Sequence, residues 1–198
     1  TFDARADLAG WRFPRGEWTL QRGILQGRQR GIGYNQGQVE AISPTCSGDV
    51  DVRVQLRKVE RLGSAGIIVG AHWDGAGAWT GILAYLDYGY DGKIFAAGIR
   101  EIYPGGPVRA CEKRFDPPRE PGWEQLRLLQ SERGYEFWVN GDYTCYAARD
   151  HFDGPGFVGI YNNGWRDADG EDLIGVDIAW FRTEHGPGRG ATAAAADE

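Results

Sequence analysis

Apolar and polar residues alternate along several segments of the chain, and a period of two is typical of β-strands. The clearest case is residues 50–57, where one face would carry only apolar side chains and the other only polar ones. The apolar set is Val50, Val52, Val54 and Leu56, and the polar set is Asp51, Arg53, Gln55 and Arg57. This segment is therefore expected to be a half-buried strand.

Further strands are predicted at 67–71, 80–88 and 135–139. The second has Ile82, Ala84, Leu86 and Tyr88 on one face, and the third has Tyr135, Phe137 and Val139 on one face with Glu136 and Trp138 on the other. Asp91-Gly92 and Asn140-Gly141 have the residue types that supply the positive φ angles of two-residue hairpin turns. Two hairpins are therefore expected at these pairs.

Helical periodicity does not extend over three or more turns anywhere in the chain, whereas predicted strands recur with turn residues between them. This pattern favours an all-β, two-sheet antiparallel sandwich over alternating strands and helices. Residues 1–185 are expected to form one sandwich domain. Residues 186–198 are rich in Gly and Ala and predict a flexible tail or linker.

Composition supports one globular domain and excludes some partners. The chain has 198 residues, is 41% hydrophobic and contains 31 Gly and 9 Pro, which suits one core with many turns. The net charge of −6 comes with interleaved signs and no basic stripe, so nucleic acid is not an expected partner. No apolar run approaches the roughly 20 residues of a membrane-spanning helix.

Three cysteines, Cys46, Cys111 and Cys145, allow at most one internal disulfide, and their spacing does not match a zinc site. We expect Cys111 to pair with Cys145, while three reduced, buried thiols are the alternative. Pairing would favour a secreted or extracytoplasmic protein. A chain that begins at Thr1 and contains no Met is also consistent with a removed secretion signal.

Several segments together resemble the concanavalin A-like lectin/glucanase superfamily, especially its laminin-G-like and 3-keto-disaccharide hydrolase-like branches. They are GEWTLQRGILQG, SGDVDVRVQLR, SAGIIVG followed by GILAYLD, WEQLRLLQSERGYEFWVNG, FVGIY and IGVDIAWFR, in this order. The resemblance implies a jelly roll of two antiparallel sheets, one of them concave. It also implies that ligands bind on the concave face or on its rim loops.

The retaining glucanases of this superfamily carry two glutamates in an E-x-D-x-x-E strand, and this motif is absent from the sequence. A partial likeness to jelly-roll alginate lyases instead makes His72 and Tyr161 candidate catalytic residues for proton abstraction and β-elimination. In this comparison Gly70 and Val158 replace the family's glutamine and lysine. The alternative is that His72 is a hydrogen-bonded structural residue and Tyr161 an ordinary aromatic of the sheet surface.

An acidic run near the carboxyl end is a candidate calcium site, because hard cations prefer oxygen ligands. Its ligands would be Asp167, Asp169 and Glu171, which alternate around Gly170. A solvated acidic turn is the alternative.

Aromatic residues in or beside two loops are candidates for carbohydrate binding, because indole rings stack on the C–H faces of sugars. The candidate ligand-binding residues are Trp73, Asp74, Trp79, Asn162, Asn163, Trp165 and Arg166. The polar members would supply directed hydrogen bonds. Packing of the tryptophans over the edges of the sandwich is the alternative.

The sequence thus predicts an extracellular, lectin-like domain that binds a carbohydrate through aromatic loops, with calcium as the only candidate cofactor. A glycoside hydrolase or polysaccharide lyase is the second hypothesis. The third is a structural module that assembles with further copies through strand edges or the C-terminal tail.

Overall fold

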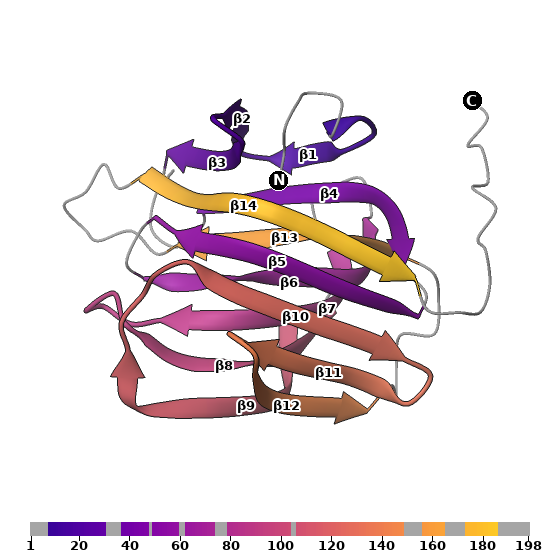
Figure 1. Cartoon of the computed structure of the whole chain (residues 1–198), viewed down its shortest axis with the longest axis vertical. Helices are drawn as coiled ribbons and strands as arrows, with labels where there is room; N and C mark the ends of the chain where they lie inside the picture. Colours follow the sequence, from indigo (N-terminus) through magenta and orange to yellow (C-terminus); the bar gives the residue numbers. More distant parts are fainter. Residues whose placement is uncertain are drawn as a thin grey trace.

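Two antiparallel sheets of seven strands each lie face to face in the computed structural model, which describes residues 8–30, 37–47, 49–59, 62–73, 79–103, 106–148, 156–164 and 173–185 (Figure 1). These residues contain no α-helix, and therefore none that could cross a membrane. The predicted antiparallel sandwich is confirmed. The predicted tail, 186–198, lies outside the described residues.

The strand order defines two sheets, called sheet A and sheet B below. Sheet A has the order β1-β4-β13-β6-β7-β8-β9, and sheet B has the order β12-β11-β10-β5-β14-β3-β2. In Figure 1 the strands of sheet B, such as β5, β10 and β14, pass in front of those of sheet A. The strands are β1 (Arg12–Arg15), β2 (Glu17–Gln21), β3 (Ile24–Arg30), β4 (Gly37–Ser47), β5 (Val50–Lys58), β6 (Gly63–Trp73), β7 (Trp79–Tyr88), β8 (Ile94–Tyr103), β9 (Gly106–Arg119), β10 (Glu124–Ser131), β11 (Gly134–Val139), β12 (Asp142–Ala148), β13 (Gly156–Gly164) and β14 (Leu173–His185).

The core lies between the sheets and is built from the inward faces of their strands. Sheet B contributes Val52, Val54, Leu56, Leu126, Leu128 and Phe137, and sheet A contributes Ile67, Val69, Ile82, Leu86, Ile99 and Ile160. All twelve side chains are almost completely buried. Complete burial of one such aliphatic side chain stabilises the fold by about 1.5–3 kcal/mol. The alternation predicted for 50–57 is confirmed, since its apolar set faces this core.

One of the two predicted turns is confirmed and the other needs correction. Asn140 and Gly141 have φ angles of 54° and 85° and join β11 directly to β12, as a two-residue turn requires. The second hairpin joins β7 to β8, but its loop contains residues 89–93. There Gly92 has a positive φ of 79° and Asp91 does not, so the prediction of a two-residue turn was wrong.

A disulfide joins the two sheets along one side of the sandwich. It links Cys111 of β9, the last strand of sheet A, to Cys145 of β12, the outermost strand of sheet B, with the two Cα atoms 6.2 Å apart. Two other contacts cross the same edge: Arg119 binds Asp142 at 3.0 Å, and Lys113 Nζ donates to the Tyr143 carbonyl at 3.4 Å. The disulfide is thus the covalent link between strands that belong to different sheets.

Candidate functional site

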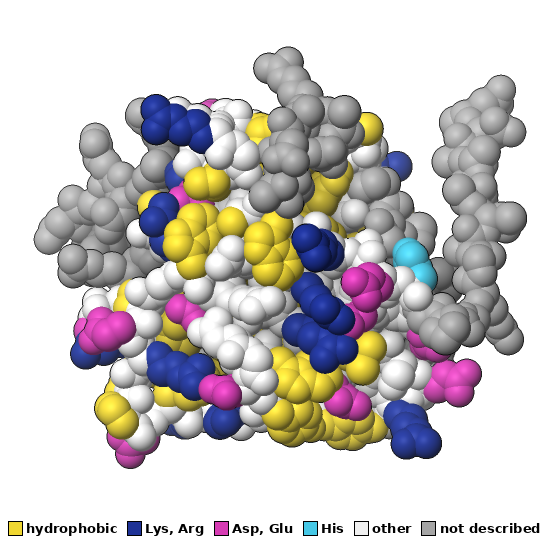
Figure 2. Space-filling model, viewed as in Figure 1, with side chains coloured by type: hydrophobic (Ala, Val, Ile, Leu, Met, Phe, Trp, Pro, Cys, Tyr) yellow, Lys and Arg dark blue, Asp and Glu magenta, His cyan; other side chains and the backbone are white. Residues whose placement is uncertain are grey.

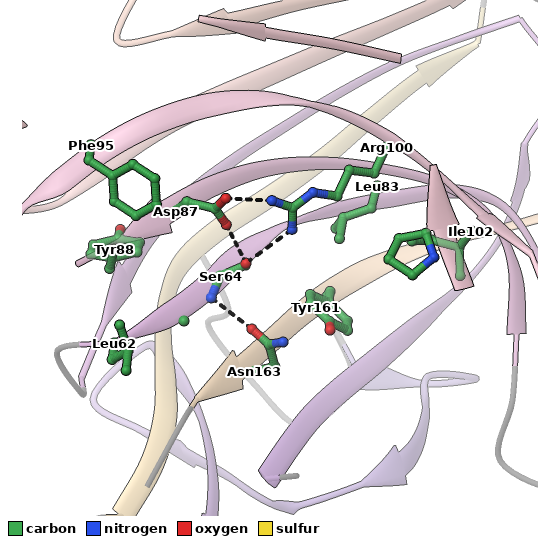
Figure 3. A pocket seen from close by; sticks show the side chains of 12 residues that line it. Leu62, Ser64, Leu83, Asp87, Tyr88, Phe95, Arg100, Ile102, Tyr161 and Asn163 are labelled. Carbon is green, nitrogen blue, oxygen red and sulfur yellow. Dashed lines mark hydrogen bonds and ion pairs between the residues drawn. The ribbon is translucent and has the colours of Figure 1, made fainter. Parts of the chain in front are cut away.

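The outer face of sheet A carries a pocket of about 370 Å³ over strands β6, β7, β8 and β13 (Figure 3). Its polar side chains are Ser64, Asp87, Arg100 and Asn163. Apolar walls surround them, formed by Leu62, Leu83, Phe95, Ile102, Pro107 and Tyr161. The pocket therefore combines a polar floor with apolar sides, as small-molecule sites commonly do.

Strand register explains how the charged pair in the pocket forms. Leu83 lies opposite Arg100, whereas Asp87 lies four residues farther along β7 on the same face. The Arg100 side chain reaches Asp87 by lying across the ring of Tyr85, with its guanidinium carbon 3.7 Å from the ring centroid. Its Nη2 donates to Asp87 Oδ2 at 2.5 Å. Stacking and the ion pair together hold the guanidinium in one orientation.

Ser64 and Asn163 extend this network onto two more strands. The Ser64 hydroxyl donates to Asp87 Oδ1, and Arg100 Nη1 lies 3.5 Å from the same hydroxyl oxygen. The Ser64 backbone N–H donates to Asn163 Oδ1 at 2.7 Å. Figure 3 shows these contacts as a continuous chain from β13 through β6 to β7 and β8. The polar floor is therefore fixed before any ligand arrives.

A second carboxylate, Glu112 of β9, lies on the other side of Tyr85. The Tyr85 hydroxyl donates to Glu112 Oε2 at 3.0 Å, and Nε atoms of Arg109 and Arg114 approach the carboxylate at 3.1 Å. Burial raises the pKa of Tyr85 to about 12, so the phenol stays protonated. Burial would also raise the pKa of Glu112, but hydrogen bonds from Arg114 and Tyr85 and the charges of Arg109 and Arg114 outweigh it and lower the pKa.

Two aromatic residues that the sequence singled out meet beside the pocket. Trp79 and Tyr161 pack edge to face, with ring centroids 6.0 Å apart, in a cluster with Ile68 and Leu83. Each is only 8% exposed, so a ligand would meet the edge of either residue and not a whole ring face. Their assignment to ligand binding and to catalysis stays a prediction.

His72 does not share this face with Tyr161. The pairing of β6 with β7 is irregular between Val69 and His72, and beyond this bulge it is Ala71 that packs with Trp79 and Tyr161. Because neighbouring side chains of a strand point to opposite faces, His72 projects away from the pocket. The arrangement therefore does not bring the two candidate catalytic groups together.

The asparagine pair also splits between the two faces of sheet A. Asn163 lines the pocket, whereas Asn162 is fully buried and accepts a hydrogen bond from Lys58 Nζ at 3.0 Å. Asn162 thus faces the interior of the sandwich. A ligand in the pocket would contact Asn163 and not Asn162.

The remaining candidates stay predictions because their side chains lie outside the described part of the chain. They are Trp73, whose backbone ends β6, the loop residues Asp74, Trp165 and Arg166, and the candidate calcium ligands Asp167, Asp169 and Glu171. Among the residues that the structure describes, no group of three His, Cys, Asp or Glu side chains is placed to hold a metal ion.

Sequence reasoning missed Ser64, Tyr85, Asp87, Arg100 and Glu112. One signal was present: Asp87 ends the apolar run GILAYL, where a charged side chain at the end of a buried strand requires a partner. The partner itself, Arg100, was not recognisable, because only the pairing of β7 with β8 brings it to Asp87.

No protein-family model matches the sequence, and no curated protein matches it. Solved structures do resemble the chain. The carbohydrate-binding module CBM66 from Bacillus subtilis has a TM-score of 0.68 at 15% identity, over 88% of this chain and 95% of that chain.

Two other solved structures share the fold. A β-1,3-1,4-glucanase (lichenase) derived from a mouse hindgut metagenome has a TM-score of 0.61 at 13% identity, over 86% of this chain and 91% of that one. A legume lectin-like domain from Entamoeba histolytica has a TM-score of 0.58 at 11% identity, over 91% of this chain and 92% of that one. The chain therefore has the jelly-roll fold of the concanavalin A-like lectins and glucanases, as the sequence resemblance predicted.

Proposed function

We propose that the protein binds a carbohydrate through the pocket on the outer face of sheet A. The observation that carries the proposal is the fixed pair of Asp87 and Arg100 beside apolar walls. Sugar hydroxyls both donate and accept, so one hydroxyl can donate to the carboxylate while a neighbour accepts from the guanidinium. Leu83, Ile102 and the edge of Tyr161 would contact the C–H face of the same sugar ring.

The pocket is already ordered, which favours binding. Arg100 stacks on Tyr85, and Asp87 accepts hydrogen bonds from both Arg100 and Ser64, so little side-chain freedom is lost when a ligand enters. The pocket volume of about 370 Å³ lies at the lower end of the range for small-molecule sites, which is roughly 300–1,000 Å³. A pocket of this size suits one or two sugar units.

Binding suits the arrangement of Asp87 and Glu112 better than glycoside hydrolysis does. Hydrolysis requires one carboxyl group that holds a proton near neutral pH, next to a second, ionised one. Glu112 has a lowered pKa, and both carboxylate oxygens of Asp87 already accept hydrogen bonds, from Ser64 and from Arg100. The comparisons support a carbohydrate as the ligand but do not separate binding from hydrolysis, since a carbohydrate-binding module, a lectin-like domain and a lichenase all share the fold.

Affinity electrophoresis through gels that contain single polysaccharides tests the proposal, followed by calorimetry with oligosaccharides of the retained polymer. Asp87→Asn keeps the shape of the side chain but removes its charge, so we expect affinity to fall about 10- to 100-fold. Asp91→Asn, in the exposed loop between β7 and β8, is the matched control and should bind normally.

Two results would contradict the proposal. One is the absence of retention by every neutral and acidic polymer in the panel. The other is that every retained polymer binds Asp87→Asn as tightly as the unchanged protein, provided that both proteins unfold at the same temperature. In the latter case the sugar site would lie elsewhere, and the loops with Trp73, Asp74, Trp165 and Arg166 would be tested next.

The same proposal includes a secreted or extracytoplasmic location. It is supported by the disulfide between Cys111 and Cys145, because such bonds persist in oxidising compartments. Fractionation of the source cells, with detection of the protein outside the cytoplasm, would test it.

A further inference from the structure

Three arginines stand side by side on the outer face of sheet B, on the side of the sandwich opposite to the pocket. In the register of the sheet Arg127 of β10 lies opposite Arg53 of β5, and Arg53 lies opposite Arg182 of β14. We call these three residues the arginine row. Figure 2 looks onto this face and shows a run of basic side chains across its middle, with acidic and apolar side chains beside it.

Two aromatic residues continue the row across the next two strands. Trp138 of β11 lies opposite Arg127, and Tyr143 of β12 lies opposite Trp138. The Arg127 guanidinium carbon is 4.6 Å from the centroid of the Trp138 ring, and the Trp138 and Tyr143 rings meet edge to face at 5.8 Å. Tyr143 is 51% exposed. The face thus presents an aromatic platform followed by three cationic groups.

The sheet itself neutralises only part of this charge. Like charges directly opposite each other on a sheet destabilise it. Asp51 accepts hydrogen bonds from both Arg53 and Arg127 at 2.7 Å, and Glu184 lies 3.9 Å from Arg53. Among the described residues Arg182 has no ion-pair partner, and its guanidinium carbon lies 5.7 Å from the centroid of the Trp180 ring.

Burial alone would raise the pKa of Asp51, but the hydrogen bonds and charges of Arg127 and Arg53 outweigh it and lower the pKa. Asp51 therefore stays ionised and holds two members of the row in place. The side chains of Arg53 and Arg127 are more than one-third exposed, and Arg182 is exposed as well, so the row is accessible to a ligand. A row of like charges that is ordered but only partly neutralised is suited to an anionic ligand.

We propose that this face binds a linear acidic polysaccharide, which lies across the strands with its carboxylates on the arginine row and a sugar ring against Tyr143 and Trp138. Neighbouring strands are about 4.7–4.9 Å apart. A chain that lies across the strands would therefore pass the three arginines in turn, and its uronate carboxylates would come within reach of these long side chains.

Polygalacturonate and its fully methyl-esterified, neutral form are the probes for affinity electrophoresis at low and high salt. We expect the acidic polymer to retard the protein more than the neutral polymer does, because only the acidic polymer has carboxylates to bind this face. The retardation should weaken as salt rises. Arg127→Gln and Arg182→Gln should each weaken binding about 2- to 5-fold, and the double variant more.

Two control variants distinguish binding at the arginine row from a general effect of net charge and from binding in the pocket. Arg133→Gln removes one exposed positive charge in the turn between β10 and β11 and should leave binding unchanged. Asp87→Asn should also leave polygalacturonate binding unchanged, because the pocket lies on the other sheet. Removing Arg182 relieves repulsion, so the variant should unfold at the same or a higher temperature, which distinguishes lost binding from lost folding.

Four outcomes would overturn the proposal. They are no retardation by polygalacturonate at low salt, an equal loss with Arg133→Gln, a loss with Asp87→Asn but not with the row variants, and equally tight binding of a single-stranded poly(dT). Failure of this proposal would not contradict carbohydrate binding in the pocket on sheet A, because that site is tested with its own variant, Asp87→Asn.

Discussion

The disulfide between β9 and β12 predicts a large and measurable loss of stability when both cysteines are replaced. Cys111 and Cys145 are 34 residues apart in sequence, and the cross-link removes conformational freedom mainly from the unfolded chain. For a loop of this length the chain-entropy relation gives about 4 kcal/mol at 25 °C. For a domain of this size that corresponds to a fall in Tm of about 8–16 °C.

The perturbation is the double variant Cys111→Ala/Cys145→Ala, compared with the unchanged protein by urea denaturation and by thermal unfolding. Cys46 is present in both proteins and does not contribute to the difference. Arg119→Gln is the control for the same edge, because its contact with Asp142 is exposed and such pairs are worth about 0–1 kcal/mol.

A loss below about 1 kcal/mol in the double variant would contradict the expected stabilisation by the disulfide. It would mean either that the bond does not form in the protein, or that the unfolded chain is already compact between the two cysteines. An equally large loss with Arg119→Gln would assign the stability of this edge to side-chain contacts instead of the disulfide.

Three further predictions follow from other parts of the structure. The pKa of Asp51 is lower in the folded protein than in the unfolded chain, so ionised Asp51 stabilises the fold above about pH 4, and this stabilisation is lost as the pH falls through the folded-state pKa. In Asp51→Asn the free energy of unfolding should therefore depend less on pH in the acid range. A methyl group at Gly66 would lie 2.0 Å from the Ala84 carbonyl oxygen, so Gly66→Ala should lower the free energy of unfolding in denaturant by about 1–3 kcal/mol. Gly122→Ala is the control and should leave this free energy unchanged, because a methyl group there would meet only Glu124 Oε1, at 3.7 Å. Arg100→Lys keeps the charge but not the planar group stacked on Tyr85, and should cost about 1 kcal/mol in thermal unfolding; no change would show that the stacking is dispensable.

The architecture could be predicted because it depends on short-range patterns. Alternation in residues 50–57 reflects the two faces of one strand, and Asn140-Gly141 fits the backbone angles of one turn. Strand β9 was missed because it is an edge strand whose side chains are mostly exposed, so its sequence lacks an apolar face. A pattern based on burial does not detect such a strand.

The pocket could not be predicted because it depends on register between strands. Asp87 and Arg100 are 13 residues apart in sequence and meet only because Arg100 crosses Tyr85 on the face that β7 and β8 share. His72 illustrates the same limit. Uninterrupted alternation would place it on the face of Ile68, but the bulge after Val69 turns it to the opposite side.

The pocket formed by Ser64, Asp87, Arg100 and Asn163 is proposed to hold a sugar. The most direct measurement is a crystal structure of the protein with an oligosaccharide of a neutral polymer that retains it in gels. We expect density for a sugar ring in this pocket, with hydroxyl groups on the Asp87 carboxylate and the Arg100 guanidinium and a C–H face toward Leu83 and Ile102. A neutral sugar bound at any other place, with this pocket empty, would contradict the proposed site.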